Sequence, residues 1–296
     1  MIGAAELTLR GLRYDEFPIY DTDARIGYIP RPNQIGDFAG RYLWKLNERS
    51  MLNEPWVPDH GHGILVIGDS LVWGEVEMAS EEKLGACLQR TLGDRYHVWS
   101  VGAGSWANLN EVEYLNRNED VVRNIRGLIW IANAGDFGDR SRWDSDFVHP
   151  RRRPIFLLGY LVGKVVVPRV KRLFPEFDGK HDLNGDAGSN VSAEAKQELR
   201  AWLRSAPRDL LRRSLFVWFP DAAEFKSRDA ATSRLLSEVR GLVEGEGLRF
   251  FDLRGDTRWQ ADCYRDPIHP SAYGNRVLAA ILEAQLPAGD PSAASP

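Results

Sequence analysis

The chain has 296 residues, a formal net charge of -4 at pH 7 and two cysteines. Its 43% hydrophobic and 27% charged residues are typical of a globular protein with a sizeable core. The negative charge gives no support to a general nucleic-acid surface, and two cysteines are too few for a disulfide framework. Cys87 lies on the apolar side of a predicted helix, which favours a buried free thiol.

The N-terminus shows neither a basic segment followed by an apolar one nor any run of transmembrane length. As written, the sequence therefore predicts a cytoplasmic protein. A truncated N-terminus would make it periplasmic or secreted instead.

Residues 1–61 show no strong helical period and are punctuated by prolines, which predicts an N-terminal extension packed on the core. Segments 23–30 and 41–47 are expected to be extended, either packing across the sheet or pairing as a small ribbon. His60 and His62 have no further ligands at a suitable spacing, so we predict a loop there rather than a metal site, and no cofactor elsewhere.

From Ile64 onward, short apolar runs alternate with helical patterns, which indicates a parallel, doubly wound sheet. Helices are expected from Ser80, whose side chain would cap the first, from about Asn108, and over 229–244 and 271–286. The fold class is therefore α/β, a flavodoxin-like three-layer α/β/α sandwich over residues 62–287. Its five parallel strands, in the order 2-1-3-4-5, are predicted at 64–67, 96–101, 128–132, 215–219 and 249–253.

An insertion over about 138–190 separates the third and fourth strands. We interpret it as a lid or subdomain over the active site, with a flexible loop at 177–190. The alternative is a basic segment at 140–172 that contacts a membrane or an acidic glycan. Its basic residues are Arg140, Arg142, Arg151, Arg152, Arg153, Lys164, Arg169, Lys171 and Arg172. The Pro- and Ala-rich tail, 288–296, is expected to be disordered.

The apolar run from Ile64 ends at Gly68, which places Ser70 at the carboxyl edge of the predicted sheet. Open α/β folds have their binding and active sites at this edge. Far along the chain, Asp266 and His269 precede the last helix. A serine hydroxyl needs a base, so His269 would take its proton while Asp266 holds the imidazole tautomer. Each segment taken alone could be only a turn or a helix cap, but together they indicate a serine hydrolase.

Gly68-Asp69-Ser70-Leu71 and Asp266-x-x-His269 resemble the first and last motif blocks of the SGNH/GDSL hydrolases. The resemblance implies an oxyanion hole made by the backbone N–H of Ser70, a glycine N–H after the second strand and an asparagine side chain after the third. Gly104 is our candidate for the glycine, although the strict family spacing falls on Ser105.

After the third strand, the family's Gly-x-Asn-Asp pattern is altered, because Gly135 occupies the position of the expected asparagine. Asn133, two residues earlier, is the candidate replacement, since alternate strand residues share a face. Asp136 is expected to be structural. Asp139 and His149 are further candidates that the insertion could bring to the site.

The leading functional hypothesis is an ester hydrolase acting on O-acetyl esters of a carbohydrate or on another small ester. A glycan O-acyltransferase would use the same triad, and a non-catalytic glycan-binding protein would keep the fold with a decayed oxyanion hole. A flavodoxin-like cofactor binder is disfavoured, because the first strand-helix turn matches no phosphate-binding pattern. The expected partner is an ester or acylated glycan, without nucleic acid, and the oligomeric state is left open.

Overall fold

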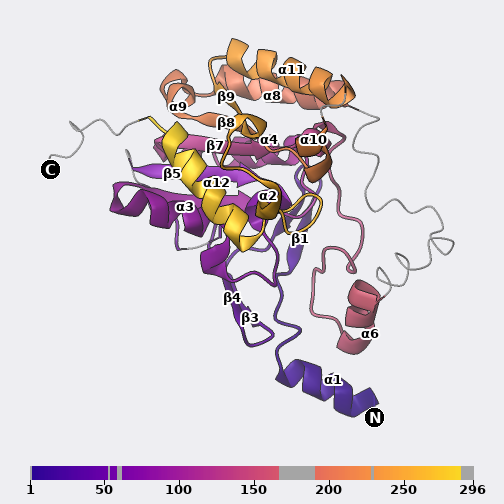
Figure 1. Cartoon of the computed structure of the whole chain (residues 1–296). Helices are drawn as coiled ribbons and strands as arrows, with labels where there is room; N and C mark the ends of the chain where they lie inside the picture. The colour runs from indigo at the N-terminus through magenta and orange to yellow at the C-terminus, as the bar shows by residue number, and fades with distance from the viewer. Residues whose placement is uncertain (1, 53, 59–61, 167–190, 228–229, 288–296) are drawn as a thin grey trace.

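A five-stranded parallel sheet with the strand order β6-β5-β7-β8-β9 forms the centre of the protein (Figure 1). The computed structural model describes residues 2–52, 54–58, 62–166, 191–227 and 230–287. The observed order confirms the predicted order 2-1-3-4-5. The strands are β5 (Gly63–Gly68), β6 (His97–Gly102), β7 (Gly127–Ala132), β8 (Leu215–Trp218) and β9 (Arg249–Asp252).

Helices cover both faces of the sheet, which confirms the three-layer sandwich. Ile64 and Val66 of β5 pack towards α3 (Leu84–Leu92) and α12 (Ala272–Gln285). Leu65 and Ile67 point to the opposite face, because side chains alternate along a strand. That face is covered by α4 (Asn108–Arg117), α5 (Glu119–Asn124), α8 (Ala193–Ser205), α9 (Arg208–Arg213) and α11 (Ala230–Gly245).

The prediction that Ser80 caps the first helix of the sheet is wrong. Ser80 begins a 3-10 turn, Ser80–Glu82, and α3 begins only at Leu84 after an uncapped Lys83. The Ser80 hydroxyl donates instead to the carbonyl of Leu43 in the N-terminal extension. The Ser80 hydroxyl, which the local sequence pattern assigned to a helix cap, therefore makes a tertiary contact instead.

The extension begins with a helix, α1 (Ile2–Gly11), that the sequence pattern did not indicate. None of its residues is buried, and its sequence lacks the apolar stripe by which a helix is predicted. Polar contacts with the insertion hold it: the Glu6 carboxylate accepts hydrogen bonds from the backbone N–H groups of Leu157 and Leu158, at 2.9 and 2.8 Å. Arg10 donates to the nearby carbonyl of Pro154 at 2.8 Å.

Two hairpins follow α1. Segment 23–30 is not one extended stretch, since Asp23 ends one strand and its carboxylate accepts from the N–H groups of Arg25 and Ile26 to form a turn. The second hairpin contains most of predicted segment 41–47. The strands are β1 (Tyr20–Asp23), β2 (Gly27–Pro30), β3 (Gln34–Phe38) and β4 (Tyr42–Leu46), each pair antiparallel.

The described part of the insertion contains α6 (Leu157–Leu161) and a π-helical turn, Val162–Val166. Residues 167–190, with Arg169, Lys171, Arg172 and the loop predicted at 177–190, lie outside the described residues, as does the tail 288–296. Extension and insertion meet in one hydrophobic cluster with α2 (Ser70–Trp73). Its buried members are Phe17, Phe38, Trp44, Leu46, Leu52, Trp73 and Leu157.

Candidate active site

Ser70 lies at the carboxyl end of β5, as the first residue of the short helix α2. Asp69 caps this helix, accepting the backbone N–H of Leu71 at 2.8 Å. The turn is packed backbone to backbone against the end of β6. A Cβ added to Gly102 would lie 2.5 Å from the carbonyl oxygen of Gly68 and 2.7 Å from that of Asp69. Glycine is therefore required at Gly102 for Ser70 to occupy this position.

The structure brings together the three residues that were predicted from the two motifs. Nε2 of His269 lies 2.9 Å from Oγ of Ser70, and its Nδ1 lies 2.9 Å from Oδ2 of Asp266. Both residues of the second motif belong to the loop before α12, which a backbone hydrogen bond from Arg265 N–H to the His269 carbonyl closes at 2.9 Å. This is the hydrogen-bonded order that activates a serine.

Asp266 is set up to remain ionised. Burial alone would raise the pKa of its carboxyl, but hydrogen bonds from the His269 N–H, the Arg265 side chain and the Ile268 N–H lower it well below the usual range. Arg265 also pairs with Glu75 at 2.9 Å, on the loop after α2. A chain of charges therefore runs from Glu75 through Arg265 to the carboxylate that holds His269.

Ser70 and Gly104 line the same cavity, and their backbone N–H groups are the candidate oxyanion donors. Within the described ranges, those of Ser70 and Gly104 donate to no protein acceptor. The carbonyl of Gly104, by contrast, accepts from Tyr28 Oη at 2.6 Å and from His149 Nε2 at 3.2 Å. Ser105, which the family spacing would have selected, has a left-handed backbone with φ of 62°.

Asn133 lies beside the nucleophile's turn, with its Nδ2 donating to Oδ2 of Asp69 at 3.3 Å. Its Oδ1 accepts the Gly135 N–H at 2.7 Å, so the amide caps the short 3-10 turn Ala134–Phe137. An amide nitrogen carries two hydrogens, so one remains for a ligand. Asn133 also borders a second hollow, of about 280 Å³, with Glu224 and Ile268.

Three buried carboxyl groups lie close enough to influence one another beneath this turn: Asp69, Glu111 and Asp136. Burial raises the pKa of each. The Asp69 charge raises the pKa values of Glu111 and Asp136 further. Asp136 has a structural contact as predicted, accepting the Asn133 N–H at 2.8 Å. Burial and the neighbouring Asp69 charge therefore disfavour the ionised forms of Glu111 and Asp136.

Ser70 opens into a cavity of about 380 Å³ that extension, insertion and α2 build together. Tyr160 of the insertion stacks on Phe17 of the extension, with ring centroids 5.2 Å apart. His149 lines this cavity, whereas Asp139 is exposed and does not. The apolar and aromatic wall includes Phe17, Tyr20, Phe38, Trp73, Tyr160 and Leu161, and the charged lining residues are Glu75, Glu77 and Lys164.

The motifs did not identify Tyr28, Arg265 or Glu75. Arg265 directly precedes Asp266, so an arginine next to the predicted triad was the available signal for it. Tyr28 and Glu75 had none, because their contacts join segments far apart in the chain. Among the described residues, no three potential metal ligands lie together. His60 lies outside the described residues. The His62 ring contacts the Arg95 carbonyl. None of the described helices is long and apolar enough to span a membrane.

No protein-family model matches this chain, and no curated protein matches it either. Solved structures with a similar fold include a protein of the G-D-S-L lipolytic family from Desulfitobacterium hafniense DCB-2, at 12% identity and a TM-score of 0.47, covering 76% of this chain and 100% of the other. A carbohydrate acetylesterase from Sinorhizobium meliloti matches at 18% identity and 0.39, covering 76% and 97%. A psychrotrophic esterase from Pseudoalteromonas sp. matches at 11% and 0.42, covering 75% and 95%.

Proposed function

We propose that this protein is a serine ester hydrolase with Ser70 as its nucleophile. The observation that carries the proposal is the pair of hydrogen bonds from Ser70 to His269 and from His269 to Asp266, both 2.9 Å long. A serine that had only a structural role in the turn would not require this alignment with a histidine 199 positions away.

In the first step, Ser70 Oγ attacks the ester carbonyl while its proton passes to Nε2 of His269. The Asp266 carboxylate accepts the Nδ1–H and stabilises the imidazolium that forms. His269 then returns the proton to the leaving alcohol, which leaves an acyl group on Ser70. A water molecule then gives a proton to His269 and attacks this acyl-enzyme. His269 returns that proton to Ser70 Oγ as the acid leaves.

The negative oxygen formed in each half-reaction needs hydrogen-bond donors that are already in place. The backbone N–H groups of Ser70 and Gly104 fill this role in the proposal. The second amide hydrogen of Asn133 replaces the donor that the family pattern would have placed at Gly135. Each such donor typically contributes a factor of about 10²–10³ to the rate.

We propose a small O-acyl ester, such as an O-acetyl group on a carbohydrate, as the substrate. A cavity of about 380 Å³ with an aromatic wall and few charged groups suits a compact, partly apolar ligand. Arg140 donates to the Leu109 carbonyl, Arg153 lies over the Phe17 ring and Lys164 donates to the Val148 carbonyl. Of these three, Lys164 lines the cavity. Arg142, Arg151 and Arg152 of the same segment are exposed. Transfer to a glycan hydroxyl in place of water would use the same groups.

The test is intact-mass labelling by a fluorophosphonate, followed by turnover of p-nitrophenyl acetate. We expect one label on the wild type and none on Ser70→Ala, with His269→Ala labelled far more slowly. Ser205→Ala, on the outer helix α8, serves as the matched control and labels like the wild type. A folded wild type that takes no label would overturn the hydrolase and favour a glycan-binding role.

A further inference from the structure

The carbonyl oxygen of Gly104 receives two hydrogen bonds from side chains outside the central sheet. Tyr28 Oη donates at 2.6 Å from strand β2 of the extension, and His149 Nε2 contacts the same oxygen at 3.2 Å from the insertion. A carbonyl oxygen only accepts, so the hydrogen of a neutral His149 ring sits on Nε2. The carbonyl oxygen therefore has two side-chain partners.

The two donors form a single packed unit. The rings of Tyr28 and His149 stack with centroids 3.9 Å apart and an interplanar angle of 26°, and Tyr20 packs edge-on against His149 at 5.0 Å. Tyr28 is 1% exposed and His149 is 7% exposed. Burial lowers the pKa of His149 to about 4, which keeps its ring neutral at pH 7. Its Nδ1 is buried without a hydrogen-bond partner among the described residues.

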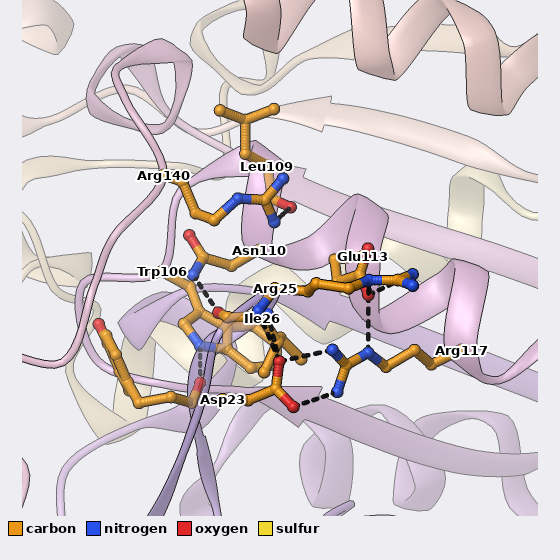
Figure 2. Close-up of polar contacts among 10 residues, drawn as sticks. Asp23, Arg25, Ile26, Trp106, Leu109, Asn110, Glu113, Arg117 and Arg140 are labelled. Carbon is orange, nitrogen blue, oxygen red and sulfur yellow. Dashed lines mark hydrogen bonds and ion pairs between the residues drawn. The ribbon is translucent and has the colours of Figure 1, made fainter.

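The strand that carries Tyr28 is fixed to α4 and the loop before it. Trp106 Nε1 donates to the Tyr28 carbonyl at 2.8 Å, and Asn110 Nδ2 donates to the Ile26 carbonyl at 2.6 Å. Figure 2 shows Asn110 reaching towards Ile26, with Arg117 bridging Asp23 of the hairpin and Glu113 of α4. The Tyr28 hydroxyl is consequently held relative to the same segment that contains Gly104.

Gly104 itself has little to fix it sterically. A Cβ built on this residue would meet nothing within 4 Å. The next residue, Ser105, is already in the left-handed region, where a peptide unit is not confined by a regular ladder of hydrogen bonds. The two hydrogen bonds to the carbonyl hold the peptide unit between Gly104 and Ser105. The Trp106 N–H on the Ala103 carbonyl and the Ser141 hydroxyl on the Ser105 carbonyl hold the rest of this turn.

We propose that Tyr28 and His149 are positioning residues. By holding the Gly104 carbonyl they fix the adjoining backbone, so that the Gly104 N–H, which belongs to the preceding peptide unit, faces the oxyanion formed at Ser70. The inference rests on the proposed hydrolase function. It assigns the extension and the insertion a part in the chemical step, because each supplies one of the two hydrogen bonds. Neither side chain touches the reacting atoms in this arrangement.

The expected signature is a loss of kcat with little change in KM, because an oxyanion donor interacts more strongly with the transition state than with the bound ester. Tyr28→Phe removes one hydrogen bond and keeps the ring, and His149→Phe removes the other while retaining an aromatic stack. We expect each to lower kcat on p-nitrophenyl acetate by roughly tenfold, and the pair by roughly 10²-fold, within the effect of losing one oxyanion donor. The rate of fluorophosphonate labelling should fall in parallel.

Tyr114→Phe is the matched control. Tyr114 is also 1% exposed, and its hydroxyl also donates to a backbone carbonyl, that of Arg49, at 2.8 Å. Tyr28→Phe and Tyr114→Phe each lose one buried hydrogen bond, so we expect equal losses of Tm. Of these two variants, only Tyr28→Phe should lower kcat. Equal kcat values for Tyr28→Phe and Tyr114→Phe would overturn the proposal. Absence of label on the wild type would instead refute the hydrolase itself.

Discussion

Replacing Gly102 by alanine should damage catalysis by displacing the turn that carries Ser70. The added Cβ would lie 2.5 Å from the Gly68 carbonyl oxygen, whereas ordinary contacts begin at 3.4 Å. The backbone must therefore give way by about 0.9 Å, the difference between these distances. Misplacing a catalytic group by about 1 Å costs on the order of 10²-fold in rate. Overpacking of this kind costs roughly 1–3 kcal/mol of stability.

The assay is kcat/KM on p-nitrophenyl acetate together with the midpoint of urea unfolding. Gly102→Ala should remain folded but lose about 10²-fold in kcat/KM. Gly241→Ala is the control, because its added Cβ meets nothing within 4 Å on the exposed side of α11. It should keep full activity and gain up to about 1 kcal/mol from helix propensity. Activity of Gly102→Ala within twofold of the wild type would refute the packing argument.

Asp266→Asn should lower kcat roughly 10³–10⁴-fold with His269 left in place, because the amide cannot stabilise the imidazolium; retention of a tenth of wild-type kcat would contradict the role of Asp266. Burial raises the pKa of Glu224 to about 7. The folded state then keeps a proton that the unfolded chain loses near pH 4.5, so stability falls by up to about 3 kcal/mol as pH rises from 4.5 to 7. Glu224→Gln should lack this decline in urea titrations at several pH values, and an identical decline would exclude Glu224 as its source. Glu6→Gln weakens the cap on α6, so hydrogen exchange should accelerate at the amides of Leu157 and Leu158; unchanged protection would show that α1 does not hold the insertion.

The central sheet was predictable because its information is local. Each strand is a short run of apolar residues, and the alternation with helical periods leaves few parallel topologies open. Ser70 and His269 were predictable for a related reason, since each stands in a short motif at a strand end or before a helix. Chain direction in a parallel sheet then brings the two motifs to the same edge.

The wall of the cavity was not predictable in the same way. Helix α1 buries no residue, so its sequence lacks the period that identifies a helix, and its contacts lie with residues 154–158. In the sequence, Tyr28 is an ordinary strand residue, and only the structure shows that its hydroxyl donates to the Gly104 carbonyl. The prediction for Ser80 was wrong because its sequence context is typical of a helix cap, but its hydroxyl donates to the distant carbonyl of Leu43.

The meeting of the extension with the insertion has a consequence for how the protein folds. Arg10 and Pro154, which hydrogen-bond across it, are 144 residues apart, so this contact closes a long loop of chain. Closing such a loop costs entropy that only a preformed sheet can offset, which places the contact late in folding. The same contact should open first under mild denaturant, before the sheet is lost. Under those conditions the nucleophile and its base would persist on a framework that no longer encloses a substrate.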